Sequence, residues 1–206
     1  MPDDLPIYPD TPLKTGLAFA DLARYQNLDQ TPIWLASDQA IARMEGADNV
    51  AGARQLLLEP STDTLLRAHS VLFPGAPGAG SLRRNLIAAR YRGQDCPEPE
   101  HIERSLNNFF KWMDAESMSE IHPIERSAIV LTRVVDIWPF EFGNLTAAIV
   151  LANAYLRQAG LPPFFVQAEH MAEFERVVGQ AVAIETQPLV QIIHRSLKRE
   201  LDRIVR

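Results

Sequence analysis

The segment from residue 137 to 144, Ile-Trp-Pro-Phe-Glu-Phe-Gly-Asn, combines a tight turn with the start of a strongly apolar run. If that run is a helix, Gly143 and Asn144 lie at its mouth, where free backbone N–H groups and the positive end of the helix dipole point to one spot. Phosphates and other anions bind well there. The alternative, which the spacing alone favours, is an ordinary loop: Gly143 relieves backbone strain, Asn144 caps the helix, and Trp138 and Phe140 fill the core.

Histidine and cysteine offer little further chemistry. The single cysteine, Cys96, excludes an internal disulfide framework and a CxxC metal site. No two of the five histidines lie four residues apart, as paired zinc ligands on a helix often do, so no metal site is predicted. We expect His69 to be a packed, hydrogen-bonded core residue and His122 to serve the entry of the helix that follows it.

Acidic residues outnumber basic ones by 26 to 20, which gives a formal net charge of −6. No run of lysine and arginine is available to displace counterions, so nucleic acid is not an expected partner. The longest apolar stretch without charge, residues 142–156, is shorter than the roughly 20 residues that cross a bilayer, so no membrane contact is expected. The acidic, proline-broken start differs from a signal peptide, and with one cysteine it predicts a cytoplasmic location.

Helical periodicity predicts the elements that position the 137–144 segment. The predicted helices cover residues 15–27, 32–46, 61–73, 98–113, 124–138, 144–158 and 187–204. The helix over 144–158 is apolar nearly all round and is expected to be the most buried. Strand signal is limited to a short hairpin around residues 89–96. The sequence predicts an all-α fold with at most one hairpin, in which residues 1–29 form an extended arm and a first helix and residues 30–206 form the main domain.

Four segments carry motifs of one protein family. Residues 138–149, WPFEFGNLTAAI, align with HPFx(D/E)GNGRxxR, and HPIE at 122–125 matches an HPxE helix entry. GSLR at 80–83 is similar to a GxFR element, and residues 151–163 end in a Gly-x-Pro-Pro exit. On these residues the chain resembles the Fic family, whose members typically transfer AMP from ATP to a hydroxyl side chain of a target protein. The resemblance covers about residues 30–205 and implies a Fic-like helical bundle with a short β-hairpin flap.

The flap of the family clamps the target peptide as an added strand. Residues 89–99 occupy its place here, with Tyr91, Arg92 and Gly93 at the turn. The resemblance therefore implies a protein as the partner of this chain.

Two catalytic positions of the motif depart from the family. The motif histidine, which takes the proton from the attacking hydroxyl, corresponds to Trp138, and an indole offers only an N–H donor. The motif acid, which holds Mg²⁺ on the phosphates, corresponds to Phe142, while Glu141 is an acid one place early. No catalytic residue is therefore assigned at the base position, and Glu141 is kept as a possible acid.

The phosphate-binding positions depart as well. The two motif arginines correspond to Thr146 and Ile149, and the glycine before the first corresponds to Leu145. The remaining candidates for binding an anion or nucleotide are Gly143, Asn144, Leu145 and Thr146.

Glu45 and Gly46 resemble the end of the inhibitory motif of the family, (S/T)xxxE(G/N). The hydroxyl position of that motif is Ile41, and the arginine that its glutamate would pair with is Ile149. We therefore expect Glu45 to have no partner in the active-site motif and to be solvated or locally paired.

Three functional hypotheses follow. The leading one is a degenerate Fic-like protein that needs no cofactor, lacks AMP transfer and binds a partner protein or a retained small ligand. The second is a nucleotide-dependent transferase with altered chemistry, using ATP with Mg²⁺, Gly143-Asn144 as the anion site and Glu141 or Glu45 as the base. The third is assembly of a homo-oligomer through the 187–204 helix or the proline-rich arm.

Overall fold

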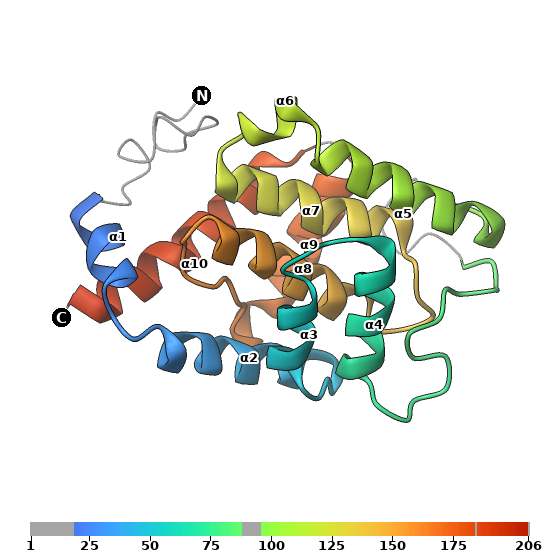
Figure 1. Cartoon of the computed structure of the whole chain (residues 1–206), viewed down its shortest axis with the longest axis horizontal. Coiled ribbons are helices and arrows are strands. Elements are labelled where there is room, and N and C mark those ends of the chain that lie inside the picture. The colour runs from blue at the N-terminus through green and yellow to red at the C-terminus, as the bar shows by residue number, and fades with distance from the viewer. Residues whose placement is uncertain (1–18, 88–95, 184, 206) are drawn as a thin grey trace.

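The computed structural model describes residues 19–87, 96–183 and 185–205, and throughout these ranges the regular elements are helices (Figure 1). The α-helices are α1 Phe19–Gln26, α2 Thr31–Glu45, α3 Val50–Leu56, α4 Thr62–Leu72, α5 Pro99–Met113, α6 Glu116–Ser119, α7 Pro123–Ile137, α8 Asn144–Gln158, α9 Met171–Val182 and α10 Gln187–Val205. A short 3-10 helix, Ala168–His170, precedes α9. The all-α prediction is confirmed.

Helix α8 lies at the centre of the molecule (Figure 1). Every residue from Asn144 to Leu156 is buried, as expected for a helix that is apolar nearly all round. Helix α7 packs along it, and together they form the most extensive helix pair of the fold. The loop that joins these two helices is the 138–143 segment, so the candidate site is built between the two helices that pack most extensively on each other.

The other helices surround this pair. Helices α2, α3 and α4 contact α8, while α5, α9 and α10 contact α7. The amphipathic pattern of α10 predicted correctly which side chains face inward: Leu189, Ile193, Leu197 and Leu201 are all buried. Helix α1 also packs against α10.

The sequence prediction missed helices α3, α6 and α9. Helix α3 has only seven residues, too few for a periodic pattern, and it begins where the Asn49 side chain accepts a hydrogen bond of 3.0 Å from the Gly52 backbone N–H. Helix α9 does carry a signal, because Phe174, Val177, Val178 and Ala181 are spaced for one buried face.

The predicted hairpin flap is not shown. Residues 88–95, and with them Tyr91, Arg92 and Gly93, lie outside the described residues. Cys96 to Glu98, the described residues that follow, contain no strand. The flap therefore stays a prediction. None of the described helices is long and apolar enough to span a bilayer.

Candidate functional site

Trp138, at the position of the motif base, ends α7 and turns the chain into the loop. Its φ of 48° is the only positive value among the described non-glycine residues, and its backbone N–H donates to the Val134 carbonyl at 2.9 Å. A left-handed conformation costs a tryptophan about 1–2 kcal/mol, so the surrounding packing must hold it. The side chain is buried, 5% exposed, and Phe140 is fully buried. Both residues fill the core, as one of the sequence interpretations proposed.

Arg83 clamps the loop from the GxFR-like segment. The side chain is 2% exposed, and its Nε donates to the Trp138 carbonyl at 2.7 Å. Its Nη1 donates to the carbonyl of Asn85 at 2.9 Å and its Nη2 to that of Pro97. Burial lowers the pKa of this guanidinium. Since all three nitrogens bind backbone carbonyls, Arg83 fixes the loop and the chain on both sides of residues 88–95.

His69 supports the loop from α4. Its Nε2 lies 3.0 Å from the Phe142 carbonyl, and its Nδ1 accepts a 3.0 Å hydrogen bond from the Gly80 N–H. The ring stacks on Phe140 with 3.7 Å between centroids. These contacts require the neutral ring with the proton on Nε2, and burial lowers the pKa of His69. The prediction of a packed, hydrogen-bonded histidine is confirmed.

Phe142, at the position of the motif acid, is a packing residue. Its ring meets that of Phe73 edge-on at 5.2 Å and lies 5.2 Å from the His69 ring. No group of three or more His, Cys, Asp or Glu side chains that could hold a metal occurs among the described residues.

Gly143 and Asn144 shape the start of α8. Gly143 has φ 67°, and a Cβ at this position would overlap the Phe73 ring, so only glycine fits. Asn144 is fully buried, with its Oδ1 accepting from the Phe140 N–H at 2.9 Å and its Nδ2 donating to the Phe140 carbonyl at 2.8 Å. Asn144 is therefore not the helix cap that the loop interpretation expected. Gly143 holds the cap position, and the Asn144 amide closes the loop from the first residue of the helix.

Glu45 reaches this helix start from the end of α2. Gly46 ends α2 in a left-handed conformation with φ 68°. One oxygen of the Glu45 carboxylate, Oε2, accepts from the Thr146 N–H at 2.9 Å and from the Thr146 hydroxyl at 2.6 Å. The group bound at the amino end of α8 is thus a carboxylate of the chain itself.

The expectation that Glu45 has no partner in the motif was therefore wrong. Its partner is Thr146, the residue at the first arginine position. The partner groups are a backbone N–H and a hydroxyl, whereas the motif of the family supplies a cationic side chain to this glutamate.

Glu141, the possible acid, is exposed and contacts a different residue. Its Oε1 accepts a 3.1 Å hydrogen bond from Nδ2 of Asn85. Leu145 is 4% exposed and Ile149 is fully buried, so both are core residues. The structure brings Glu45 to Thr146, which follows Gly143, Asn144 and Leu145 at the start of α8, and it holds Glu141 in a separate contact.

Sequence reasoning missed the role of His69 as a support of the motif loop. A lone histidine on an apolar helix carries no signal for its partner, because Phe142 lies 73 residues away. Arg83 did carry a signal in its GxFR-like motif, but that motif does not show which carbonyls it binds.

The fold is an all-helical bundle with this tight turn before its central helix. Known proteins are similar to it in sequence and in fold. Residues 59–156 match the model of the Fic/DOC family, so this part of the chain is similar to that family. It is 31% identical over 124 residues to the protein adenylyltransferase Fic of Nematostella vectensis, covering 57% of this chain and 29% of the relative. It is 29% identical over 150 residues to protein adenylyltransferase fic-1 of Caenorhabditis elegans, covering 71% and 29%.

The fold is shared with a solved fragment of Fic-1 from C. elegans. The TM-score is 0.67 at 24% identity, and the match covers 95% of this chain and 66% of the other. The chain spans less than a third of the length of the two adenylyltransferases that it matches.

Proposed function

We propose that this Fic-type domain does not transfer AMP by the route of its family and acts as a binding or regulatory domain for a partner protein, without a cofactor. One observation carries the proposal. The amino end of α8 is occupied by the Glu45 carboxylate, which binds the backbone and hydroxyl of Thr146 where the family has an arginine. A phosphate at this place would meet a negative charge.

The side chains around that contact support the proposal. Trp138 is buried and cannot act as a base, and Phe142 packs against Phe73 and offers no ligand to Mg²⁺. General-base catalysis contributes about 10²–10⁴-fold to rate, and a phosphate-binding cation or metal contributes several kcal/mol more. Loss of both groups together would leave little transfer by this mechanism.

Incubation with α-labelled ATP and Mg²⁺ tests the proposal. Fic-1 of C. elegans, named a protein adenylyltransferase, is the positive control. The wild-type chain and Glu45→Ala are each incubated alone and with a cell lysate. We expect no labelled protein with either. Rapid labelling that is lost in Asn144→Ala, with the helical circular dichroism retained, would overturn the proposal.

The second candidate is a nucleotide-dependent AMP transferase with altered chemistry. The observation in its favour is the position of Glu45, which places a carboxylate base at the start of α8. Titration calorimetry with ATP, ADP, AMP and GTP, each with and without Mg²⁺, separates the two candidates. We expect no heat of binding for any of these nucleotides with the wild type or with Glu45→Ala. Saturable binding of a nucleotide to either protein would favour the second candidate.

A cytoplasmic location belongs to the same proposal. Its support is the single cysteine, which fits a reducing compartment.

A further inference from the structure

Two hollows lie beside α10, on surfaces that residues 138–146 do not line. One has a volume of about 310 Å³ and the other about 590 Å³, and they share the wall formed by residues 165–167. Helix α10 contributes Arg195 and Arg199 to the smaller hollow and Arg203 to the larger. Arg43 of α2 also lines the larger one. A ligand that follows α10 would therefore meet three arginines in sequence.

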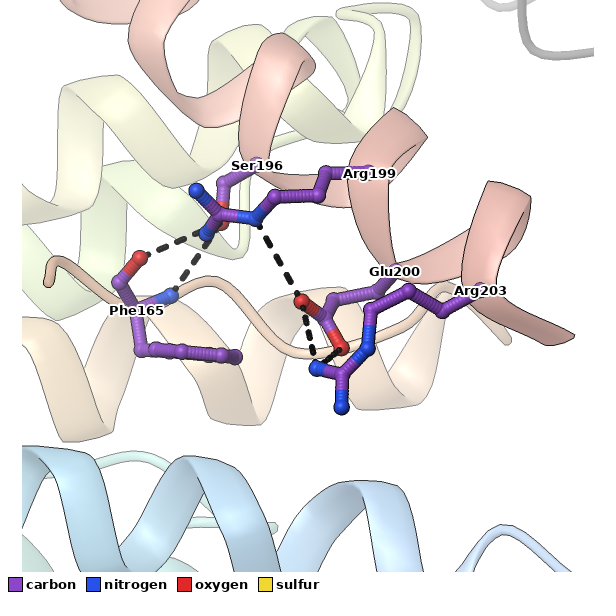
Figure 2. A network of polar contacts seen from close by, with 5 residues as sticks. All are labelled: Phe165, Ser196, Arg199, Glu200 and Arg203. Carbon is purple, nitrogen blue, oxygen red and sulfur yellow. Dashed lines mark hydrogen bonds and ion pairs between the residues drawn. The ribbon is translucent and has the colours of Figure 1, made fainter.

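A buried glutamate positions two of these arginines (Figure 2). The Glu200 side chain is 5% exposed, and its carboxylate lies 3.5 Å from Arg199 Nε and 3.1 Å from Arg203 Nη1. One carboxylate thus faces two guanidinium groups. Arg199 and Arg203 remain 37% and 66% exposed, so their outer N–H groups are accessible. Together with Glu200, the two arginines carry one net positive charge. Their side chains lose conformational freedom before any ligand binds.

The wall opposite the arginines is fixed as well. Ser196 Oγ donates to the Phe165 carbonyl at 3.2 Å and accepts from the Phe165 N–H at 3.5 Å, which ties the wall to α10 (Figure 2). The Arg199 guanidinium lies over the Phe165 ring, 5.5 Å from its centroid. The apolar residues of this wall are Phe165, which is 8% exposed, and the half-buried Met171.

The charge of this surface differs from that of the whole chain. Two further glutamates, Glu169 and Glu173, line the hollows, so with Glu200 there are four arginines against three glutamates. The complete chain has a net charge of −6. The groups that line the two hollows, taken with Glu200, thus carry an excess of one positive charge on a negative protein, which favours an acidic ligand.

The spacing of the arginines defines the shape of that ligand. Arg195, Arg199 and Arg203 are four residues apart on α10, which places successive Cα atoms about 6 Å apart along the helix axis. An extended peptide rises about 3.3 Å per residue, so its alternate side chains share one face and lie about 6.6 Å apart. Carboxylates at every second position would match the arginines, and the side chains between them would turn toward Phe165 and Met171.

We propose that the surface along α10, lined by Arg195, Arg199 and Arg203, binds an extended segment of a partner protein in which acidic residues alternate with apolar ones. Arginine suits this role because its planar fork pairs with carboxylates in a fixed geometry. The inference goes beyond the proposed function, since it requires neither activity nor inactivity of the motif.

Fluorescence anisotropy with two labelled peptides tests the spacing. The probe is acetyl-GELEVEFEG-amide, and the comparison peptide of equal composition is acetyl-GEEEELVFG-amide. We expect the alternating peptide to bind about fivefold more tightly, and to bind more weakly as salt rises. Equal affinity for the two peptides, or no binding, would overturn the proposal. No nucleotide is present, so the result is independent of AMP transfer.

A matched pair of charge reversals tests where on the protein the peptide binds. Arg195→Glu should weaken binding of the alternating peptide about tenfold, because attraction becomes repulsion at one end of the row of three arginines. Lys198→Glu makes the same change of net charge at an exposed position of α10 that lines neither hollow, and it should stay within about twofold of the wild type. An equal loss in both variants would mean unspecific charge attraction and would contradict the proposal.

A shortened chain without residues 1–18 tests the occupant. Unchanged binding supports a segment from another protein. A marked gain in affinity would mean that the chain's own first residues compete for the surface, and it would overturn the assignment to a partner.

Discussion

The carboxylate of Glu45 and the first turn of α8 form the central contact of the candidate site. Both the N–H and the hydroxyl of Thr146 donate to the same oxygen, at 2.9 and 2.6 Å. Hydrogen bonds to a charged group contribute about 1.5–3 kcal/mol, and the end of a helix dipole adds to them. This contact should both stabilise the fold and exclude other anions from α8.

A double-mutant cycle measures that contact. Glu45→Ala and Thr146→Val are made singly and together, and urea unfolding gives the free energy of each. We expect a coupling energy of about 1–2 kcal/mol, because the variants remove opposite sides of a charge-assisted hydrogen bond. Glu103→Ala, at an exposed position of α5, serves as the control and should show no coupling with Thr146→Val. Additive single changes at Glu45 and Thr146 would contradict the assigned contact.

His122 gives the protein a predicted dependence of stability on pH. It precedes α7, is 3% exposed, and its Nδ1 accepts a 3.2 Å hydrogen bond from the Ile124 N–H. The helix-entry role expected from the sequence is confirmed. Burial, with a smaller contribution from His194 of α10, lowers the pKa of His122 to about 4. Protonation would also break the Nδ1 contact.

The unfolded chain therefore binds a proton at His122 more readily than the folded one. The stabilisation is complete above the unfolded pKa of about 6.5 and is lost as the pH falls toward about 4. We expect the free energy of unfolding to decrease by about 2 kcal/mol over this window, and His122→Asn to flatten the profile. Urea unfolding at pH 7, 5.5 and 4.5 measures it, with His101→Asn, at an exposed position, as the control. An identical slope in His122→Asn and wild type would contradict the prediction.

At the scale of the elements, the junctions that end α2 and begin α8 determine how the site is assembled. Both junctions hold a glycine with positive φ, Gly46 at 68° and Gly143 at 67°. The two glycines differ in the room available for a side chain. A Cβ on Gly46 meets nothing within 4 Å, whereas one on Gly143 overlaps the Phe73 ring. The α8 junction is thus set by packing as well as by backbone conformation.

Alanine substitutions separate these two effects. Gly46→Ala should cost about 1 kcal/mol, since only the left-handed conformation is penalised. Gly143→Ala should cost about 1–3 kcal/mol more, because the Phe73 ring must move. Chemical denaturation measures both. In a Phe73→Ala background the ring is absent, so adding Gly143→Ala there should cost less stability than it does in the wild type. Equal losses of stability in Gly46→Ala and Gly143→Ala would refute the overlap.

The whole molecule uses the apolar stripe of α10 in its own core. Leu189, Ile193, Leu197 and Leu201 are buried against the rest of the chain, which leaves the polar side of this helix outward. One of the three hypotheses is assembly of a homo-oligomer through this helix or through the proline-rich arm, and pairing through the apolar face of α10 would need the helix to detach. Size-exclusion chromatography with light scattering should therefore give the mass of one chain. A dimer mass that Arg195→Glu reduces to one chain would instead indicate pairing through the polar face.

How far the sequence predicts the fold depends on the range of each interaction. The helix over residues 144–158 was located correctly, because its continuous apolar run and the Gly-Pro stop are local properties. Helix α3 was missed, since seven residues give no clear period. The missing base and arginines of the motif were also visible from residue types alone.

The sequence by itself determined which groups the site lacks, because the absence of a histidine at Trp138 or an arginine at Thr146 requires no geometry. Only the tertiary structure decided what takes their place. Glu45 and Thr146 are 101 residues apart, His69 and Phe142 are 73 apart, and Arg83 and Trp138 are 55 apart. Periodicity reports which face of a helix is buried, but the packing of helices distant in the chain selects the partner that each buried polar group meets.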